Sequence, residues 1–280
     1  MKTNIFFFSG TGNSLFIAQR LQESLENSEL IPIVKALKKS DKKIEAEKIV
    51  IIFPIYALTI PLPVRDFLKS FDFGGVQYCS AIATRLGLYF DDFKRIDKLI
   101  KPYKLNSHFI LNMGNNDVKR ENYKCPSENE IKVLETENLK ELKKISQIIS
   151  NNTESREKDS NYLEALPFGD IRDKFIGWFI PKLMTFSKVI GGVNYFYLNS
   201  NCNGCGICSK VCLSGKIIMK KKQPIWNKKT LCHMCYACIN FCPTKAIEID
   251  SIPGVPSYSY ENERYSHPYA GIKEIQNQKG

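Results

Sequence analysis

Short apolar runs alternate with longer amphipathic stretches through the first half of the chain. The apolar runs predict five strands, at residues 2–8, 30–34, 48–53, 78–84 and 109–113. The amphipathic stretches predict helices at residues 15–25, 63–71, 89–100 and 139–149. Nearly continuous apolar strands that alternate with helices are typical of a parallel sheet covered on both faces. We therefore expect an α/β domain built on a doubly wound, five-stranded parallel sheet.

A loop rich in glycine and hydroxyl groups, residues 9–14, joins the first predicted strand to the first predicted helix. It reads Ser9-Gly10-Thr11-Gly12-Asn13-Ser14, and we call it the glycine–hydroxyl loop. Backbone N–H groups at a helix N-terminus favour an anion, and glycine lets the chain approach it closely, so the loop predicts a phosphate site. No lysine follows Gly12, which excludes a triphosphate P-loop. Leu15 and Lys35 stand where a dinucleotide site needs glycine and an acidic residue, which excludes that class too.

The glycine–hydroxyl loop, in its strand–helix setting, resembles the flavodoxin family. The resemblance implies the sheet order 2-1-3-4-5, with FMN outside the carboxyl ends of the strands. It implies that one set of loop residues holds the FMN phosphate, namely Ser9, Thr11, Gly12, Asn13 and Ser14. It also implies that the loops after the third, fourth and fifth strands reach the flavin ring, through Pro54, Tyr56, Thr84, Arg85, Gly87 and Asn115.

Two of these ring contacts have competing interpretations. Tyr56 is either the ring that stacks on the flavin or a partly buried residue at the rim. Arg85 departs from the aromatic residue or glycine that flavodoxins often show near this position. It is either a solvated charge or a cation whose position near the ring would stabilise reduced FMN.

Eight of the ten cysteines lie between residues 202 and 242, in two runs with the spacing Cys-x2-Cys-x2-Cys-x3-Cys. The first run is Cys202, Cys205, Cys208 and Cys212, and the second is Cys232, Cys235, Cys238 and Cys242. Each cysteine of the second run follows its counterpart by 30 residues, and the flanking residues also correspond. This spacing indicates an internal duplication.

The two runs closely resemble the two-cluster ferredoxins, in which the fourth cysteine of each run binds the cluster of the other run. The resemblance implies that one [4Fe-4S] cluster is held by Cys202, Cys205, Cys208 and Cys242. The other is then held by Cys232, Cys235, Cys238 and Cys212. Zinc is the alternative, but it needs only four ligands, usually in two pairs, and eight cysteines at this spacing exceed that need.

Several residues near these motifs have simpler interpretations. Leu213 stands where the ferredoxin pattern usually has proline, which would loosen the turn without removing a ligand. His233 is expected to be a solvated loop residue rather than a ligand. Cys79 is expected in the sheet core, and Cys125 as an exposed free thiol in a polar loop.

Composition shifts divide the chain into four parts. We expect a flavodoxin-like domain at 1–168, a connecting helical segment at 169–198, a small α+β ferredoxin-like domain at 199–250 and a tail at 251–280. Apolar residues from 175 to 190 recur at helical spacing among lysines. This pattern predicts a helix that either packs between the domains or lies on a membrane surface, and we favour packing between the domains. The tail is expected to lie over the protein as a cover.

Charge bears on partners and location. Lys and Arg number 40 against 29 Asp and Glu, a formal net charge of +11. No recognition helix or aromatic–basic platform is visible, so nucleic acid is not expected. Lysines between the cysteine runs are either solvated or dock an acidic redox protein. Two clusters at about −2 each and a phosphate at about −2 would leave the loaded protein at about +5. Without an apolar span or signal peptide, we expect a cytoplasmic protein with reduced thiols.

Together the two patterns resemble the flavodoxin–ferredoxin fusion proteins of anaerobes. The resemblance implies electron transfer between FMN and two [4Fe-4S] clusters in a soluble carrier or oxidoreductase module. No acid–base pair or nucleophile triad is visible, and we assign no catalytic residue. Two alternatives remain: an FMN-dependent reductase of a small acceptor such as a quinone, and a redox-sensing interaction protein.

Overall fold

The computed structural model of the protein describes residues 1–56, 59–86, 93–156, 196–251 and 256–280. Gly87, the start of the helix expected at 89–100 and nearly all of the connecting segment expected at 169–198 lie outside the described residues. Within the described parts, no helix is long and apolar enough to cross a membrane.

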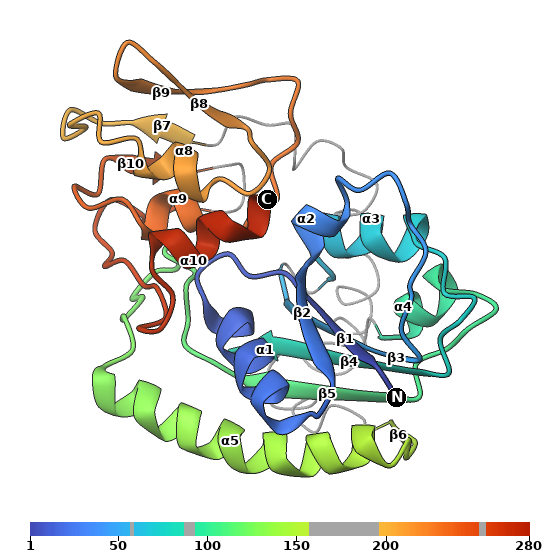
Figure 1. The fold of residues 1–280 in the computed structure, drawn as a ribbon. Coiled ribbons are helices and arrows are strands. Elements are labelled where there is room, and N and C mark those ends of the chain that lie inside the picture. The colour runs from blue at the N-terminus through green and yellow to red at the C-terminus, as the bar shows by residue number, and fades with distance from the viewer. Residues whose placement is uncertain (57–58, 87–92, 157–195, 252–255) are drawn as a thin grey trace, which may run out of the picture.

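A parallel sheet forms the centre of the first half of the chain (Figure 1). Its strands are β1 (Thr3–Phe7), β2 (Ser28–Pro32), β3 (Lys48–Pro54), β4 (Tyr78–Arg85), β5 (Ser107–Asn112) and β6 (Ser155–Arg156). They stand in the order β2-β1-β3-β4-β5-β6, and every neighbouring pair is parallel. The predicted doubly wound, flavodoxin-like sheet is therefore confirmed. The added strand β6 consists of only two residues, both of them polar, so no alternating apolar pattern marked it as a strand.

Helices cover both faces of this sheet (Figure 1). α1 (Asn13–Ser24) packs on α5 (Glu128–Ser150), and on the other side α3 (Leu62–Ser70) contacts α2 (Ile33–Ala36) and α4 (Phe93–Leu99). Because all strands run in one direction, the carboxyl ends of β1, β3, β4 and β5 meet at one edge, where the glycine–hydroxyl loop also lies.

Two predicted boundaries in this half were wrong. α5 starts at Glu128 rather than at residue 139, because Ser127 and Glu130 form a capping box. The Ser127 side chain accepts a hydrogen bond from the Glu130 N–H, and the Glu130 carboxylate accepts one from the Ser127 N–H. The second strand ends at Pro32, and Ile33 begins the short helix α2 instead of continuing the strand.

The second half forms a small α+β unit, as predicted. It contains β7 (Phe196–Leu198), α8 (Ile207–Val211), β8 (Ile217–Lys220), β9 (Gln223–Trp226), α9 (Ala237–Asn240) and β10 (Ile247–Ile249). β7 pairs with β10, and β8 with β9, both antiparallel. The chain ends in α10 (Ile272–Gln276) and the 3-10 helix η2 (Asn277–Lys279), and α10 packs against α8 (Figure 1).

The apolar core of the sheet continues into this second half. Val211, Leu213 and Ala237, together with Ile275 of α10, belong to the same buried cluster as the strand residues. Leu213, the residue that departs from the ferredoxin pattern, is only 4% exposed. Its side chain therefore contributes to the packing between the two halves, which a proline at this position would do less well.

Candidate functional site

Four cysteines from both runs line one pocket beside α8. Cys202, Cys205 and Cys208 lie just before and within α8, and Cys242 follows α9. Burial, and then the charges of the other three cysteines, raise the pKa of Cys208 to about 11. We call these four residues the first cysteine group; the structure brings them together in the crossed arrangement that the ferredoxin resemblance implies.

The remaining four cysteines of the runs form the second cysteine group: Cys212, Cys232, Cys235 and Cys238. Burial, and then the charge of Cys212, raise the pKa of Cys232 to about 11. Burial, and then the charges of its three group members, also raise the pKa of Cys238, and Cys208 adds to this effect. Cys208 and Cys238 also belong to the same buried cluster, so the two groups adjoin each other there.

Burial keeps the thiols of Cys208, Cys232 and Cys238 protonated in the protein alone, so iron has to displace protons there on binding. No group of three or more His, Cys, Asp or Glu side chains in the described ranges is arranged around a single metal ion. A cubane differs from a single ion in that each of its four thiolates binds a separate iron atom.

Two cations that sequence reasoning missed lie beside the cysteine groups, and Lys216 is buried whereas Arg264 is half-buried. Lys216 is 1% exposed, donates from Nζ to the carbonyls of Asn227 and Thr230 at 3.0 and 2.7 Å, and lowers the pKa of Cys232. Arg264 lies near Cys242 and Cys238; burial lowers its pKa, which their negative charges partly restore. Both cations would offset the negative charge of a loaded cluster. Nothing in their local sequence marks them, because each acts over a contact distant along the chain.

The glycine–hydroxyl loop is buried at the carboxyl edge of the sheet. Gly12, at the N-cap of α1, has φ 103°, a conformation that favours glycine. Ser14 Oγ lies 2.8 Å from Thr84 Oγ1, which joins the start of α1 to the end of β4. Thr11 Oγ1 accepts from Asn116 Nδ2 at 2.8 Å, and Ser9 Oγ accepts from the Gly12 N–H at 3.1 Å. The first N–H groups of α1 have no acceptor within the helix, which leaves them for an anion.

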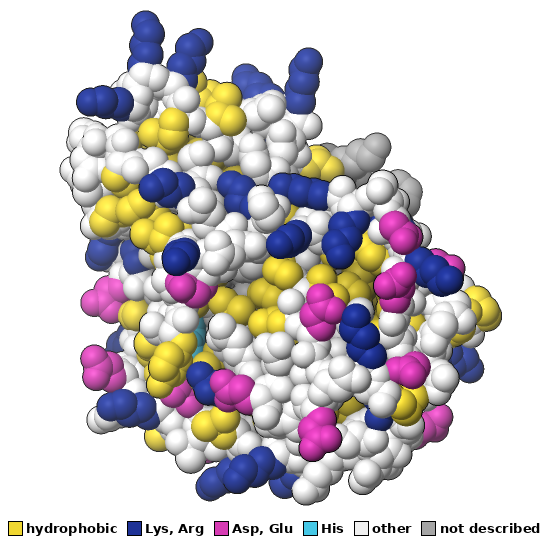
Figure 2. Space-filling model, viewed as in Figure 1, with side chains coloured by type: hydrophobic (Ala, Val, Ile, Leu, Met, Phe, Trp, Pro, Cys, Tyr) yellow, Lys and Arg dark blue, Asp and Glu magenta, His cyan; other side chains and the backbone are white. Residues whose placement is uncertain are grey.

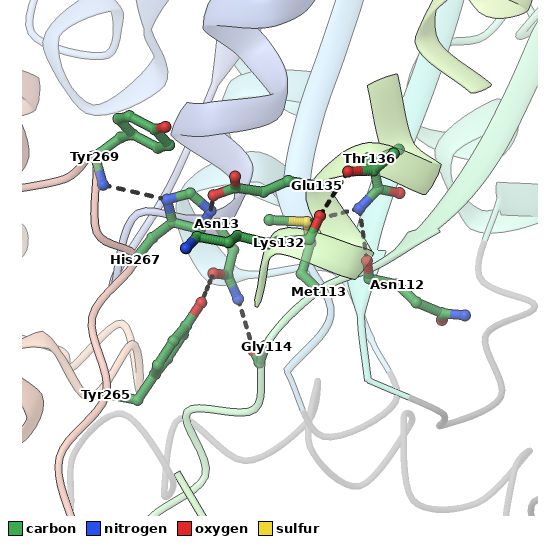
Figure 3. Close-up of polar contacts among 11 residues, drawn as sticks. Asn13, Asn112, Met113, Gly114, Lys132, Glu135, Thr136, Tyr265, His267 and Tyr269 are labelled. Atoms are coloured by element: carbon green, nitrogen blue, oxygen red, sulfur yellow. Dashed lines mark hydrogen bonds and ion pairs between the residues drawn. The ribbon is translucent and has the colours of Figure 1, made fainter. Parts of the chain in front are cut away.

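The C-terminal segment, residues 256–280, lies against this loop. Gln278 accepts from the Ser9 N–H at 3.0 Å and donates to the Ser9 carbonyl at 2.9 Å. Tyr265 donates to Asn13 Oδ1 at 2.8 Å, while Asn13 Nδ2 donates to the Gly114 carbonyl at 2.7 Å (Figure 3). The segment therefore holds both ends of the loop.

His267 of the C-terminal segment stands directly over Gly12. Its backbone N–H donates to the Thr11 carbonyl at 2.8 Å, and its ring stacks on the Phe16 ring, with 4.6 Å between the ring centroids. A Cβ on Gly12 would lie 2.8 Å from His267 Cβ and 2.3 Å from Ala270 Cβ. Although Glu135 Oε1 lies 3.4 Å from Nε2 (Figure 3), burial lowers the pKa of His267 to about 4, so the ring is neutral at pH 7.

The predicted ring-contact residues lie along the same edge. Pro54 and Thr84 are adjacent in register at the ends of β3 and β4. Arg85 is 8% exposed and donates from Nε to Asn112 Oδ1 at 3.4 Å, so the interpretation as a solvated charge was wrong. Asn115 Oδ1 accepts from the Asp117 N–H at 2.9 Å.

Tyr56 lies where the glycine–hydroxyl loop meets the second cysteine group. A Cβ on Gly10 would lie 2.5 Å from the Cys235 carbonyl oxygen, 2.7 Å from Cys235 Cβ and 2.7 Å from the Tyr56 hydroxyl. Burial, and then the charge of Cys235, raise the pKa of Tyr56, and no described residue accepts a hydrogen bond from its hydroxyl. Sequence reasoning placed Tyr56 beside a flavin but did not place it beside a cysteine ligand.

Two other expectations were wrong and one was confirmed. His233 is not solvated: its ring packs edge-on against Phe8 at 5.7 Å, and burial lowers its pKa to about 4. Cys125 is half-buried, with Sγ 3.7 Å from the Arg264 carbonyl oxygen, rather than exposed. Cys79 is buried in the sheet, as expected.

Comparison with known proteins agrees with this division of the chain. Residues 201–247 match the family model of the 4Fe-4S dicluster domain. A solved flavodoxin from the domain Archaea is 12% identical and aligns over 52% of this chain and 99% of its own, with a TM-score of 0.33. The azoreductase AzrA is 13% identical and aligns over 51% of this chain and 98% of its own, also with a TM-score of 0.33. No curated protein matches the chain. The part of the chain that the structure describes thus joins a parallel α/β sheet to a segment that matches the 4Fe-4S dicluster domain.

Proposed function

We propose that this protein transfers electrons between FMN and two [4Fe-4S] clusters within one chain, as an electron carrier or oxidoreductase module. One observation carries the proposal: the cysteine groups form a continuous series that ends at the glycine–hydroxyl loop. Cys208 lies near Cys238 of the second group, and Cys235 of the same group packs against Gly10. Three redox centres held in this series would give a short intramolecular path.

Each cysteine group would hold one cluster in this proposal. The first group presents its four thiols to one pocket, and the second group is closed off by burial. Lys216, which is buried, and Arg264, which is half-buried, would neutralise part of the cluster charge. A buried anion without such cations would be costly to form.

The glycine–hydroxyl loop would hold the FMN phosphate through its N–H groups and hydroxyls, and the loop contains no carboxylate to repel it. His267 and Ala270 already occupy the space over Gly12. The phosphate therefore has to reach the loop from another side, or the C-terminal segment has to move away from Gly12 first. Arg85, buried at the end of β4, would supply a positive charge near the flavin ring.

When bound, FMN would exchange two electrons and pass them singly, while each cluster carries one. We expect anaerobically purified protein to contain flavin, iron and sulfide, with about eight irons per chain and three separable redox couples. Elemental analysis followed by a redox titration measures this. Zinc in place of iron, together with no flavin, would contradict the proposal.

An acidic redox protein is the partner that the surface of the β8–β9 hairpin fits. Ile218 and Ile225 face each other across the hairpin and are 50% and 41% exposed. Exposed lysines flank them at Lys220, Lys221, Lys222, Lys228 and Lys229. Figure 2 shows cationic side chains gathered over this end of the molecule, with apolar side chains between them. Met219 and Pro224 of the same hairpin line the pocket of the first cysteine group, so a protein docked here would lie close to the first cluster.

The turn of the β8–β9 hairpin holds its two lysines in a backbone conformation that is unfavourable for them. Lys221 and Lys222 form the two-residue turn with φ 49° and 63°, a conformation that favours Asn-Gly. Each left-handed lysine costs about 1 kcal/mol relative to a glycine. The turn thus holds two positive charges at positions where the backbone favours Asn-Gly.

Changing the turn to Lys221→Asn with Lys222→Gly should separate stability from docking. We expect a higher free energy of unfolding, because the turn is relaxed, and about tenfold slower electron exchange with an acidic protein at low ionic strength. Stopped-flow rates across a salt series measure the second effect. As a control, Lys140→Gln with Lys143→Gln removes the same charge from α5. Equal slowing by both pairs would contradict a local docking surface.

A further inference from the structure

We propose that Tyr56 is a hydrogen-bond donor to the sulfur of Cys235 and thereby sets the reduction potential of the second cluster. The inference rests on the proposed function, since it takes Cys235 as a cluster ligand. It does not depend on whether the Tyr56 ring also stacks on a flavin.

Position is the first argument. The Tyr56 hydroxyl and Cys235 Cβ each lie 2.7 Å from a single point, the place where a Cβ on Gly10 would stand. Both groups therefore pack on the same side of the bare backbone of Gly10. They come from residues 179 positions apart in the chain, on the loop after β3 and the loop before α9.

The unused hydrogen bond is the second argument. The Tyr56 hydroxyl is buried and has no partner within the described part of the chain. A buried hydroxyl without a partner is costly, and native proteins rarely keep one. The ring makes an edge-on contact with Phe8, at 6.3 Å between ring centroids, which helps to keep the hydroxyl in this buried position. A cluster thiolate beside it would be the missing acceptor.

A hydrogen bond from Tyr56 to the Cys235 sulfur would change the reduction potential of the second cluster. A thiolate that accepts a hydrogen bond holds its negative charge in a more favourable environment, and hydrogen bonds to cluster sulfurs are one of the means by which proteins set cluster potentials. Reduction adds a negative charge to the cluster, so a donor at Cys235 favours the reduced form. Tyr56 would then make the second cluster easier to reduce, at the place where the cluster faces the glycine–hydroxyl loop.

The test is Tyr56→Phe in the full-length, cluster-loaded chain, with Tyr103→Phe as the matched control. Tyr103 packs on Phe73 at the far side of the sheet, at 6.4 Å between ring centroids. We expect a titration followed by electron paramagnetic resonance to show that Tyr56→Phe shifts the oxidised-to-reduced ratio of the second cluster about tenfold toward the oxidised form. This shift corresponds to a reduction potential about 59 mV lower. The first cluster and the control should not change. Repeating the titration in a Cys202→Ser background assigns the signal to the second cluster.

The unloaded protein supplies a second readout. Because the hydroxyl has no partner there, Tyr56→Phe should leave the unfolding midpoint of the apoprotein equal or higher. A lower midpoint, or an unchanged potential in a variant with full iron content, would overturn the inference. Failure of the wild-type chain to bind iron and sulfide would instead overturn the proposed function, so the two failures are distinguishable.

Discussion

Cys242→Ser is expected to remove the same cluster as Cys202→Ser, although the two residues belong to different runs. Each variant should lose about half of the iron and acid-labile sulfide. The reason is the crossed arrangement, in which Cys242 and the first three cysteines of the first run line one pocket. By the same reasoning, Cys212→Ser should match Cys232→Ser. Iron analysis, with the potential of the cluster that remains, measures both pairs.

Cys125→Ser is the control for these variants, because Cys125 is half-buried and lies outside both cysteine groups. It should keep full iron content. If the cluster remaining in Cys242→Ser had the potential of the one remaining in Cys232→Ser, each run would hold its own cluster. The crossed ligand sets would then be wrong.

Gly10→Ala is expected to separate the glycine–hydroxyl loop from the second cysteine group. The new methyl group would lie 2.5 Å from the Cys235 carbonyl oxygen, and a backbone atom cannot turn aside as a flexible side chain can. Overpacking of this kind costs about 1–3 kcal/mol. We expect a lower free energy of unfolding and slower electron exchange between flavin and clusters. Denaturant unfolding and rapid-mixing reduction measure the two effects.

Gly75→Ala is the matched glycine control. A Cβ there would lie 3.7 Å from the Ile44 carbonyl oxygen, an ordinary contact on the exposed surface. It should change neither stability nor electron exchange appreciably. If Gly10→Ala behaved like Gly75→Ala, the close packing at Cys235 would not be a feature of the folded protein.

Local patterns predicted the parts of the fold that local forces determine. Alternating apolar runs identified five of the six strands of the main sheet, and duplicated cysteine spacing identified the small second unit. The start of α5 was missed although Ser127 and Glu130 carry the capping signal, because the apolar periodicity becomes regular only later in the helix. The signal for the start of this helix was therefore present in the sequence.

Other features had no local signal to find. The hydrogen bonds of Gln278 with Ser9 join residues 269 positions apart. The buried position of Lys216 depends on two carbonyls, from Asn227 and Thr230, that fold over it. The placement of Tyr56 beside Cys235 depends on how the two halves pack together. Such contacts follow from tertiary structure, and spacing in a single sequence does not encode them.

The contact between Gln278 and Ser9 also sets an order of events during synthesis. At about 5–20 residues per second, the ribosome needs on the order of half a minute to reach Gln278 after it has made Ser9. Throughout that interval the nascent chain carries the glycine–hydroxyl loop without the segment that later lies over Gly12. Capture of a phosphate-bearing cofactor by the emerging chain would thus meet no competitor, whereas in the finished chain His267 and Ala270 already occupy the space over Gly12.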